Sequence, residues 1–505
     1  MRQVRFLTQC IFLSLIIAVA ACGKKSSPGE TQPPPTKPED PPVADGGANS
    51  NLGNIAVTVD CNQSQGTLYR FEQANTTSTT SPLPGTKAQT LLQGLHHKVV
   101  RVWIQLRYVY NKGYNYKYDG SGVAVEDALS FYSSVSDSLL VCMSAYNGTA
   151  SSPMPAAGTA YQNFVKNTVV YYKTKFPKIK YIQVGNEPDY NGDAIDTYYT
   201  VYKDYYKGIA AANAALNLTG NNRILVSNGP FTSTTTFSAM LPYTSQFLAR
   251  YAADTDPDKH LDFFCFHCYT ENDNPKSIAN DKTQIENLMT SYGVPKVPIF
   301  VTELGIYGGS YIPSAWTEAD AVTAQPAGQF AKLYNLYDSG ISRVFNWAVY
   351  HGDIKRKSEF ADLTNAYTYP YGNALICSSE LSVRGNRIQA TLTRALDSKG
   401  LGINAMAAIG NNKGIAVLVW NYNFTNAVAD QSGNIMIKNI PQSMFTGKIR
   451  RTVYLIDSKN NNYFNNSTQK NLTALSDEAF DYSASVGVPL TLERNSVALV
   501  TLTPQ

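Results

Sequence analysis

Between about residues 54 and 350, short apolar runs alternate with amphipathic helical stretches, and this alternation limits what the chain can fold into. Most of the runs are continuously apolar, as expected of strands that are buried on both faces of a parallel sheet. The runs expected to be strands are residues 55–60, 99–106, 139–144, 181–185, 224–227, 263–267, 299–302 and 344–347. Eight strands that alternate with helices over roughly 300 residues predict an α/β fold of the TIM (β/α)8 barrel type.

An open, doubly wound sheet is the alternative fold, but no Gly-rich phosphate loop follows the first run. The barrel is expected over residues 51–382. After that the pattern changes to short apolar runs separated by Asn- and Gly-rich turns, without long helical stretches. This predicts a β-sandwich domain over residues 383–505. The sequence leaves open whether the stretch before the first barrel strand contributes a strand to the sandwich.

Residues 1–21 predict a bacterial lipoprotein signal peptide. Arg2 and Arg5 precede an apolar run that is too short to span a bilayer as a mature helix. The run ends in Val-Ala-Ala-Cys22-Gly, which resembles a lipobox, where Cys22 takes a diacylglycerol; an ordinary signal peptide cleaved nearby is the alternative. Residues 22–50 are rich in Pro and Gly and predict an extended tether. We therefore expect a lipid-anchored protein of the bacterial cell envelope, on the outer membrane or the periplasmic face.

Charge and cysteine content exclude several classes of protein. The formal net charge of +4 includes the two leader arginines, so the rest of the chain carries about +2. This charge is too small to indicate a nucleic-acid-binding protein.

The cysteines do not indicate a disulfide framework. Of seven cysteines, Cys10 lies in the leader and Cys22 in the lipobox, and the remaining five have no regular spacing. Cys265 and Cys268 form a C-x-x-C pair, but no second pair completes a metal site, and in a strand the two would face opposite sides. The sequence therefore predicts no metal site.

Two glutamates stand at the predicted carboxyl ends of strands. Asn186-Glu187-Pro188 ends the fourth run, and Thr302-Glu303 ends the seventh. In a TIM barrel the carboxyl ends of the strands form the active face, and strands four and seven lie across its mouth from one another. Glycosidic cleavage requires two such carboxyl groups, one to protonate the leaving oxygen and one to attack or to activate water. The sequence therefore predicts a glycosidase.

On these residues the barrel resembles glycoside hydrolase clan A, and within it family 39, which is xylosidase- and iduronidase-like. The clan carries its acid/base in Asn-Glu-Pro after strand four and its nucleophile after strand seven. The resemblance thus implies Glu187 as general acid/base and Glu303 as nucleophile of a retaining enzyme. It extends more weakly to the second domain, where Arg384-Gly-Asn-Arg-Ile and Leu492-Glu-Arg-Asn-Ser-Val resemble the sheet domain of several of these families. Leu304 departs from family 39, whose members often have an aromatic residue directly after the nucleophile.

The resemblance also implies two polar helpers. Arg101 stands on the second strand, as in the clan, where its permanent charge would keep Glu303 ionised. A surface or salt-bridged arginine is the alternative. Asn186 would hydrogen-bond the 2-hydroxyl of the sugar, a contact that strengthens in the transition state.

Three further residues follow strands six and eight. His267 and Tyr269 match the strand-six pattern His-x-Tyr and would hydrogen-bond substrate or nucleophile. Trp347 ends strand eight, where the clan has a tryptophan that acts as the sugar platform. The alternatives are a core histidine and a core tryptophan.

We therefore expect a retaining glycosidase that cleaves a poly- or oligosaccharide by double displacement, a reaction that needs no metal or cofactor. A glycan-binding lipoprotein that has lost catalysis is the alternative from another class, although such proteins usually lose a carboxylate and both are present here. A polysaccharide lyase would need a different base. No motif indicates the sugar, the anomer, exo or endo action, or the oligomeric state.

Overall fold

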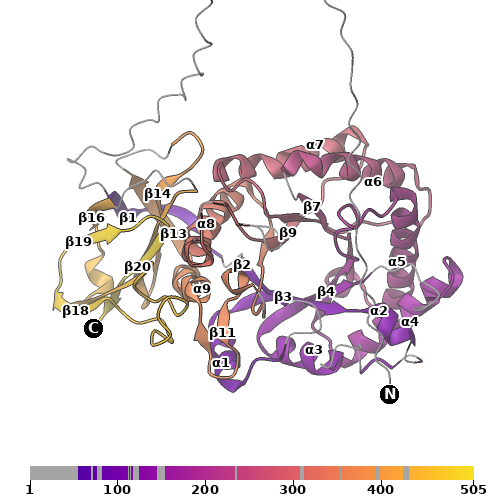
Figure 1. Ribbon diagram of the computed structural model, residues 1–505, viewed down its shortest axis with the longest axis horizontal. Coiled ribbons are helices and arrows are strands. Elements are labelled where there is room, and N and C mark those ends of the chain that lie inside the picture. Colours follow the sequence, from indigo (N-terminus) through magenta and orange to yellow (C-terminus); the bar gives the residue numbers. More distant parts are fainter. Residues whose placement is uncertain are drawn as a thin grey trace, which may run out of the picture. The chain divides into compact units, whose positions relative to one another are not determined.

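The computed structural model describes residues 55–69, 72–76, 82–111, 113, 115–117, 124–144, 154–233, 236–306, 312–314, 316–352, 354–392, 397–424 and 431–505 (Figure 1). The predicted leader, the lipidation residue Cys22 and the tether lie outside these residues, so the lipid anchor stays a prediction. Within the described ranges, no helix combines the length and the apolar character needed to cross a bilayer.

The first structural unit is a closed parallel barrel, as predicted. Its hydrogen-bonded strand order is β6-β5-β4-β3-β2-β10-β9-β8-β7, and a parallel bridge between Ser227 and Phe263 joins β6 to the chain that enters β8. Figure 1 shows the strands as a ring with helices outside it. The strands are β2 (Glu72–Asn75), β3 (His97–Ile104), β4 (Ser136–Met143), β5 (Ile179–Val184), β6 (Leu225–Asn228), β7 (Phe231–Ser233), β8 (Phe264–Cys268), β9 (Ile299–Leu304) and β10 (Arg343–Asn346).

Helices cover the outer face of the barrel, and several of them do so through one apolar stripe. In α4 the predicted stripe from Tyr161 to Tyr172 is buried. Helix α8 begins at a capping box between Thr317 and Asp320 and ends at Gly340, whose φ of 79° suits glycine. The helices are α1 (Thr86–Gly94), α2 (Leu106–Asn111), α3 (Val125–Ser134), α4 (Thr159–Lys175), α5 (Ile195–Ala215), α6 (Leu241–Ala253), α7 (Asp281–Ser291), α8 (Glu318–Ser339) and α9 (Pro370–Ser382). Short 3-10 turns span Gly220–Asn222, Phe237–Ala239, Pro275–Asn280, Lys355–Lys357 and Gln442–Met444, and a small hairpin joins β11 (Phe360–Asp362) to β12 (Tyr367–Thr368).

The second unit is the predicted β-sandwich, built from one continuous mixed sheet around its own apolar core. Its strand order is β18-β17-β20-β15-β14-β13-β1-β16-β19. In β19, buried and exposed residues alternate strictly, which places every second side chain in the core. The strands are β1 (Ile55–Thr67), β13 (Asn386–Leu392), β14 (Gly402–Gly410), β15 (Gly414–Tyr422), β16 (Gln431–Lys438), β17 (Lys448–Ile456), β18 (Ser476–Asp481), β19 (Ser485–Leu492) and β20 (Ser496–Pro504).

The prediction that residues 55–60 form the first barrel strand is wrong. They belong to β1, which pairs antiparallel with β13 and parallel with β16 in the sandwich sheet. The barrel begins instead at β2, which pairs with β3 and β10. Pattern reading passes over β2 because Glu72-Gln-Ala-Asn75 is short and mostly polar, although all four residues are buried.

Barrel and sandwich share apolar contacts. The ring of Trp420 on β15 lies 6.0 Å from the ring of Phe330 and 5.9 Å from that of Tyr334, both on α8. A Cβ at Gly328 of α8 would lie 2.8 Å from the Tyr422 ring, so this close approach requires glycine. The core that surrounds the barrel therefore continues into the sandwich.

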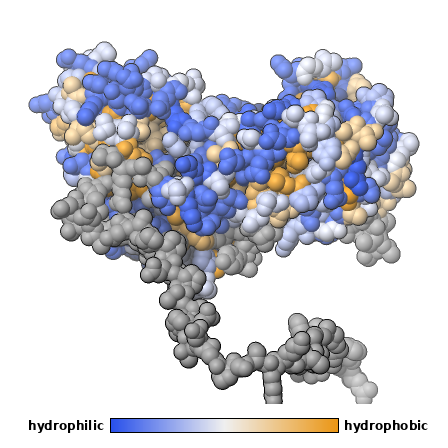
Figure 2. All heavy atoms as spheres, turned by 90° about the horizontal axis from the view of Figure 1, so that it is seen from above, coloured by the Kyte–Doolittle hydropathy of each residue, from blue (hydrophilic) through white to orange (hydrophobic). Residues whose placement is uncertain are grey.

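The surface is mainly polar. Figure 2 shows a largely hydrophilic face with smaller apolar areas. The large hydrophobic side chains most exposed among the described residues are Tyr69, Tyr190 and Leu475.

Candidate active site

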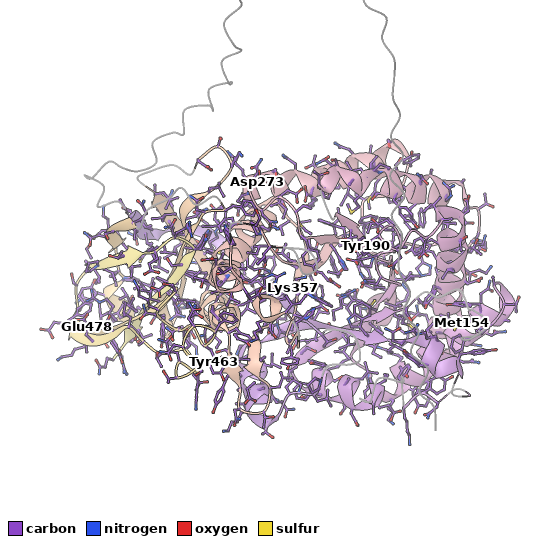
Figure 3. All side chains as sticks on the ribbon, viewed as in Figure 1. Met154, Tyr190, Asp273, Lys357, Tyr463 and Glu478 are labelled. Carbon is purple, nitrogen blue, oxygen red and sulfur yellow. The ribbon has the colours of Figure 1, made fainter. Side chains whose placement is uncertain are left out.

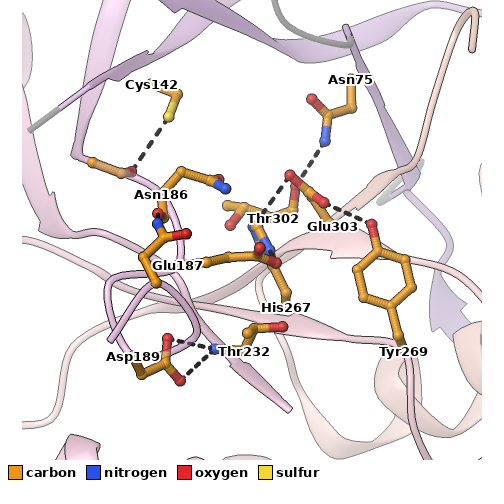
Figure 4. Close-up of polar contacts among 12 residues, drawn as sticks. Asn75, Cys142, Asn186, Glu187, Asp189, Thr232, His267, Tyr269, Thr302 and Glu303 are labelled. Atoms are coloured by element: carbon orange, nitrogen blue, oxygen red, sulfur yellow. Dashed lines mark hydrogen bonds and ion pairs between the residues drawn. The ribbon is translucent and has the colours of Figure 1, made fainter. Parts of the chain in front are cut away.

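Glu187 stands at a sharp turn directly after β5. Gly185 has a φ of 81° and Glu187 itself a φ of 50°, a left-handed conformation that costs a non-glycine residue on the order of 1 kcal/mol. The turn is held by two backbone hydrogen bonds, from Gly185 to Met143 and from Glu187 to Pro230. Local strain of this kind persists where the surrounding structure holds it in place, and here the Glu187 side chain extends toward His267 (Figure 4).

Glu303 lies near the end of β9, where a bulge changes the side-chain alternation. The register between β8 and β9 shifts between the pairs Phe266–Val301 and His267–Glu303. In a regular strand Thr302 and Glu303 would face opposite sides. Because of the bulge, both take part in the same interior network: the Thr302 hydroxyl accepts a hydrogen bond of 2.9 Å from Gln183, and Glu303 accepts bonds from the other side of the barrel.

Arg101, on β3, organises the layer below the two glutamates. Its side chain is completely buried and donates to Glu303 Oε1 at 2.7 Å, to Asn186 Oδ1 at 2.7 Å and to Gln183 Oε1 at 2.8 Å. A weaker contact of 3.4 Å reaches Asn75 Oδ1. The planar guanidinium group can donate to several acceptors at once, and its fixed positive charge pairs with Glu303.

His267 lies between the two glutamates. Its Nδ1 is 2.7 Å from Glu187 Oε1, and its Nε2 is 3.5 Å from Glu303 Oε1. Burial lowers the pKa of His267 to about 3, so the imidazole is neutral at ordinary pH. One oxygen each of Glu187 and Glu303 and one His267 nitrogen all lie within 4.8 Å of one another.

Tyr269, two residues along the same face, completes the contacts of Glu303. Its hydroxyl donates a 2.6 Å hydrogen bond to Glu303 Oε2 (Figure 4). Burial raises the pKa of Tyr269 well above its ordinary value, so the group stays a donor. Glu303 thus accepts hydrogen bonds on both oxygens, from Arg101 and from Tyr269.

Glu187 has a different environment. Burial raises its pKa above the ordinary value, against the smaller opposing effects of a hydrogen bond with Thr232 and of the charges on Arg101 and Lys357. Nearby Asp189 accepts hydrogen bonds from the backbone N–H of Thr232, and burial raises the pKa of its carboxyl group to about 6. Glu187 thus has a raised pKa, whereas Glu303 is paired with Arg101. Unlike environments of this kind allow one carboxyl group to act as an acid and the other as an anion.

Two tryptophans border the site. Trp347 follows β10 directly, is partly exposed, and meets Trp103 edge to face at 6.5 Å. Trp103 is held by a 2.9 Å hydrogen bond from its indole nitrogen to the Thr76 carbonyl, and Arg101 lies 4.6 Å from its ring centre. Trp347 therefore lies at the end of β10, the last strand of the barrel, where the sequence predicts a sugar platform.

The structure brings Glu187, Glu303, Asn186, Arg101, His267 and Tyr269 into one hydrogen-bonded cluster and places Trp347 at its border. His267 lies beside Glu303, the nucleophile that the sequence predicted, and also contacts Glu187, which the sequence did not predict. Sequence reasoning missed Asn75, Gln183 and Lys357. Polar residues inside strands were the available signal for the first two. Lys357 lies in a 3-10 turn after β10, and no sequence motif marks it. Its ammonium lies 4.9 Å from the Tyr269 ring centre. Figure 3 shows Lys357 within the ring of barrel strands in that view.

Glu187, His267 and Glu303 have donor atoms spaced closely enough for a metal ion. The Arg101 guanidinium, however, already supplies the positive charge next to Glu303, and a metal ion there would be repelled by it. The arrangement suits proton transfer and nucleophilic attack by the two carboxyl groups.

No protein-family model matches the chain, and no curated protein matches it in sequence. Solved structures do match. A glucosidase from Croceicoccus marinus has a TM-score of 0.66 at 14% identity, over 89% of this chain and 99% of that one. A monomeric beta-xylosidase from Caulobacter crescentus CB15 has a TM-score of 0.60 at 13% identity, over 89% of this chain and 100% of that one. The GH39 enzyme from Xanthomonas axonopodis pv. citri has a TM-score of 0.59 at 16% identity, over 89% and 97%. At this identity the likeness shows a shared fold, the TIM barrel with its β-sandwich.

Proposed function

We propose that the protein is a retaining glycoside hydrolase in which Glu303 is the nucleophile and Glu187 the general acid/base. The observation that carries the proposal is the facing pair itself: two glutamates from opposite strands, with oxygens within 4.8 Å of each other, in unlike environments. Carboxyl groups of retaining enzymes stand roughly 5–5.5 Å apart, whereas inverting enzymes need roughly 6.5–9.5 Å to admit a water molecule. The glucosidase and beta-xylosidase named above, on the same fold, support a carbohydrate substrate.

In the first step Glu303 attacks the anomeric carbon, the glycosidic C–O bond breaks, and Glu187 gives its proton to the leaving oxygen. In the second step Glu187, now ionised, takes a proton from water as the water attacks the anomeric carbon, and Glu303 leaves. Asn186 accepts from Arg101 through Oδ1. Its amide N–H groups are therefore available to donate to the sugar hydroxyl next to the reacting carbon.

His267 suits the starting protonation states of both carboxyl groups. As a neutral imidazole, it accepts a proton at one nitrogen and donates one at the other. Nδ1 can accept from protonated Glu187 at 2.7 Å, while Nε2 carries the hydrogen and lies 3.5 Å from Glu303 Oε1 without a hydrogen bond. The acid and the anion that the first step needs are therefore compatible with a single imidazole.

The test is hydrolysis of a panel of poly- and oligosaccharides and aryl glycosides, with proton NMR of the first-formed sugar. A product that keeps the substrate's anomeric configuration, and Glu303→Gln protein without turnover on the same substrate, would support the proposal. An inverted first product would refute the retaining assignment. Binding of a glycan without turnover of any would favour the alternative, a glycan-binding protein.

A further inference from the structure

A second cluster of ligand-type side chains lies on the outer side of β8, behind the site described above. Cys268 ends β8 and faces away from the barrel interior, since His267 and Tyr269 on either side of it point inward. Glu271 follows in the next loop, and Asp281 begins α7. One potential ligand atom from each of Cys268, Glu271 and Asp281 lies within 4.8 Å of the other two.

One buried polar group of this cluster has no partner among the described residues. Oδ2 of Asp281 is buried without a hydrogen bond, in a residue that is 2% exposed. A carboxylate oxygen that is buried without a partner is destabilising, so it points to a further ligand that the cluster can bind.

The charge of Lys332 acts on Cys268 and Asp281 of this cluster; Lys332 is completely buried and donates a 2.9 Å hydrogen bond to the carbonyl of Gly305. Lys332 carries one positive charge, while a thiolate and two carboxylates carry three negative charges. A divalent cation brings the sum to zero, so Lys332 completes the neutrality of an occupied site and does not exclude the ion.

We propose that Cys268, Glu271 and Asp281 bind a divalent transition-metal ion of the zinc type. A sulfur ligand disfavours Mg²⁺ and Ca²⁺, which take oxygen ligands, whereas Zn²⁺ accepts sulfur and carboxylate oxygen together. The ligands come from the end of β8, the following loop and the start of α7. Gly305, whose carbonyl contacts Lys332, stands two residues after Glu303. The bound ion is structural: it fixes the strand ends that carry His267, Tyr269 and Glu303.

The test uses the full chain without a polyhistidine tag, stripped by chelator and then titrated with Zn²⁺. After gel filtration the protein should retain about one zinc per chain by mass spectrometry, and Zn²⁺ should raise its melting temperature by several degrees. Co²⁺ in place of zinc should give a near-ultraviolet thiolate charge-transfer band. Neither readout depends on glycosidase activity, so the proposal can fail or stand independently of the proposed function.

Cys265 provides the matched control. It is equally buried and lies three residues earlier on β8, but it belongs to the interior cluster of the barrel. Cys268→Ser should lose the cobalt band and at least tenfold in zinc affinity, Asp281→Asn should also weaken zinc binding, and Cys265→Ser should retain both properties. Substoichiometric zinc in the unmodified protein with an unchanged melting temperature would overturn the proposal, because the cluster would then be satisfied by water alone. Equal binding by the Cys268 and Cys265 variants would overturn it as well.

Discussion

Arg101 Nη1 lies 2.7 Å from Glu303 Oε1, and the side chains of both residues are buried, at 0% and 6% exposure. The pair spans the barrel from β3 to β9. Removing one member of a buried ion pair leaves the other as an uncompensated charge in a medium of low polarity.

The first prediction concerns this pair. Arg101→Met should lower the free energy of unfolding by about 3–5 kcal/mol, because Glu303 loses its counter-charge. In a Glu303→Gln background the same substitution should cost less, since no buried anion remains. Urea denaturation of the four proteins in this double-mutant cycle measures the difference. Equal losses in both backgrounds would mean that the ion pair contributes nothing beyond the separate contacts of each residue.

Tyr269→Phe removes the 2.6 Å hydrogen bond to Glu303 Oε2 and little else. Hydrogen bonds to charged groups contribute about 1.5–3 kcal/mol, so kcat/KM should fall by roughly 10- to 150-fold if the bond acts in the transition state. Tyr190→Phe, at an exposed residue on the loop after Glu187, is the control and should leave kcat/KM within a factor of a few. Steady-state kinetics on an aryl glycoside gives both values.

The pH profile should respond to Lys357. The charge of Lys357 lowers the pKa of Glu187, so Lys357→Met should raise that pKa further. A general acid works while it is protonated, and the basic limb of kcat/KM should therefore move to higher pH. Lys355→Met, at an exposed position on the same turn, should leave the limb in place. A shift toward lower pH in the Lys357 variant would contradict the role of Glu187 as the acid.

Glu187→Ala should lose its activity on poor leaving groups by about 10²–10⁴-fold, the usual contribution of a general acid. An aryl glycoside with a good leaving group needs little protonation, so its first step should survive while deglycosylation slows. Added azide should restore turnover because it attacks without a base, and it should yield a glycosyl azide of retained configuration. In Glu303→Gln protein, azide should not restore this retained product.

The lipid anchor is tested separately. Cys22→Ala should move the protein from the membrane fraction to the soluble fraction, since the lipobox cysteine would carry the acyl chains. Cys10→Ala, within the leader, is the control and should leave membrane association unchanged. Detergent partitioning of the Cys22 variant identical to that of the unchanged protein would count against lipidation at this residue.

The sequence anticipated most of the barrel because strands buried on both faces are continuously apolar, and it anticipated the glutamates because each follows such a run. It failed at β2, where Gln73 and Asn75 are buried through hydrogen bonds and not through apolarity. The apolar alternation of β1 does not reveal which sheet it joins, since strand pairing is decided over hundreds of residues. The contact between His267 and Glu187 depends on the register shift between β8 and β9 and on the turn at Glu187. Neither feature can be predicted from the residue types in these segments.

The placement of β1 has a mechanical consequence. Everything that precedes Ile55 is attached to the molecule through a strand held between β13 and β16. A pull on the amino-terminal end would load these two ladders along the strand direction, where many hydrogen bonds resist together. The barrel would receive that load only through the sandwich and the link from Thr67 to Glu72. In a protein held at its amino terminus, the sandwich would thereby bear the strain while Glu187 and Glu303 keep their relative positions in the barrel.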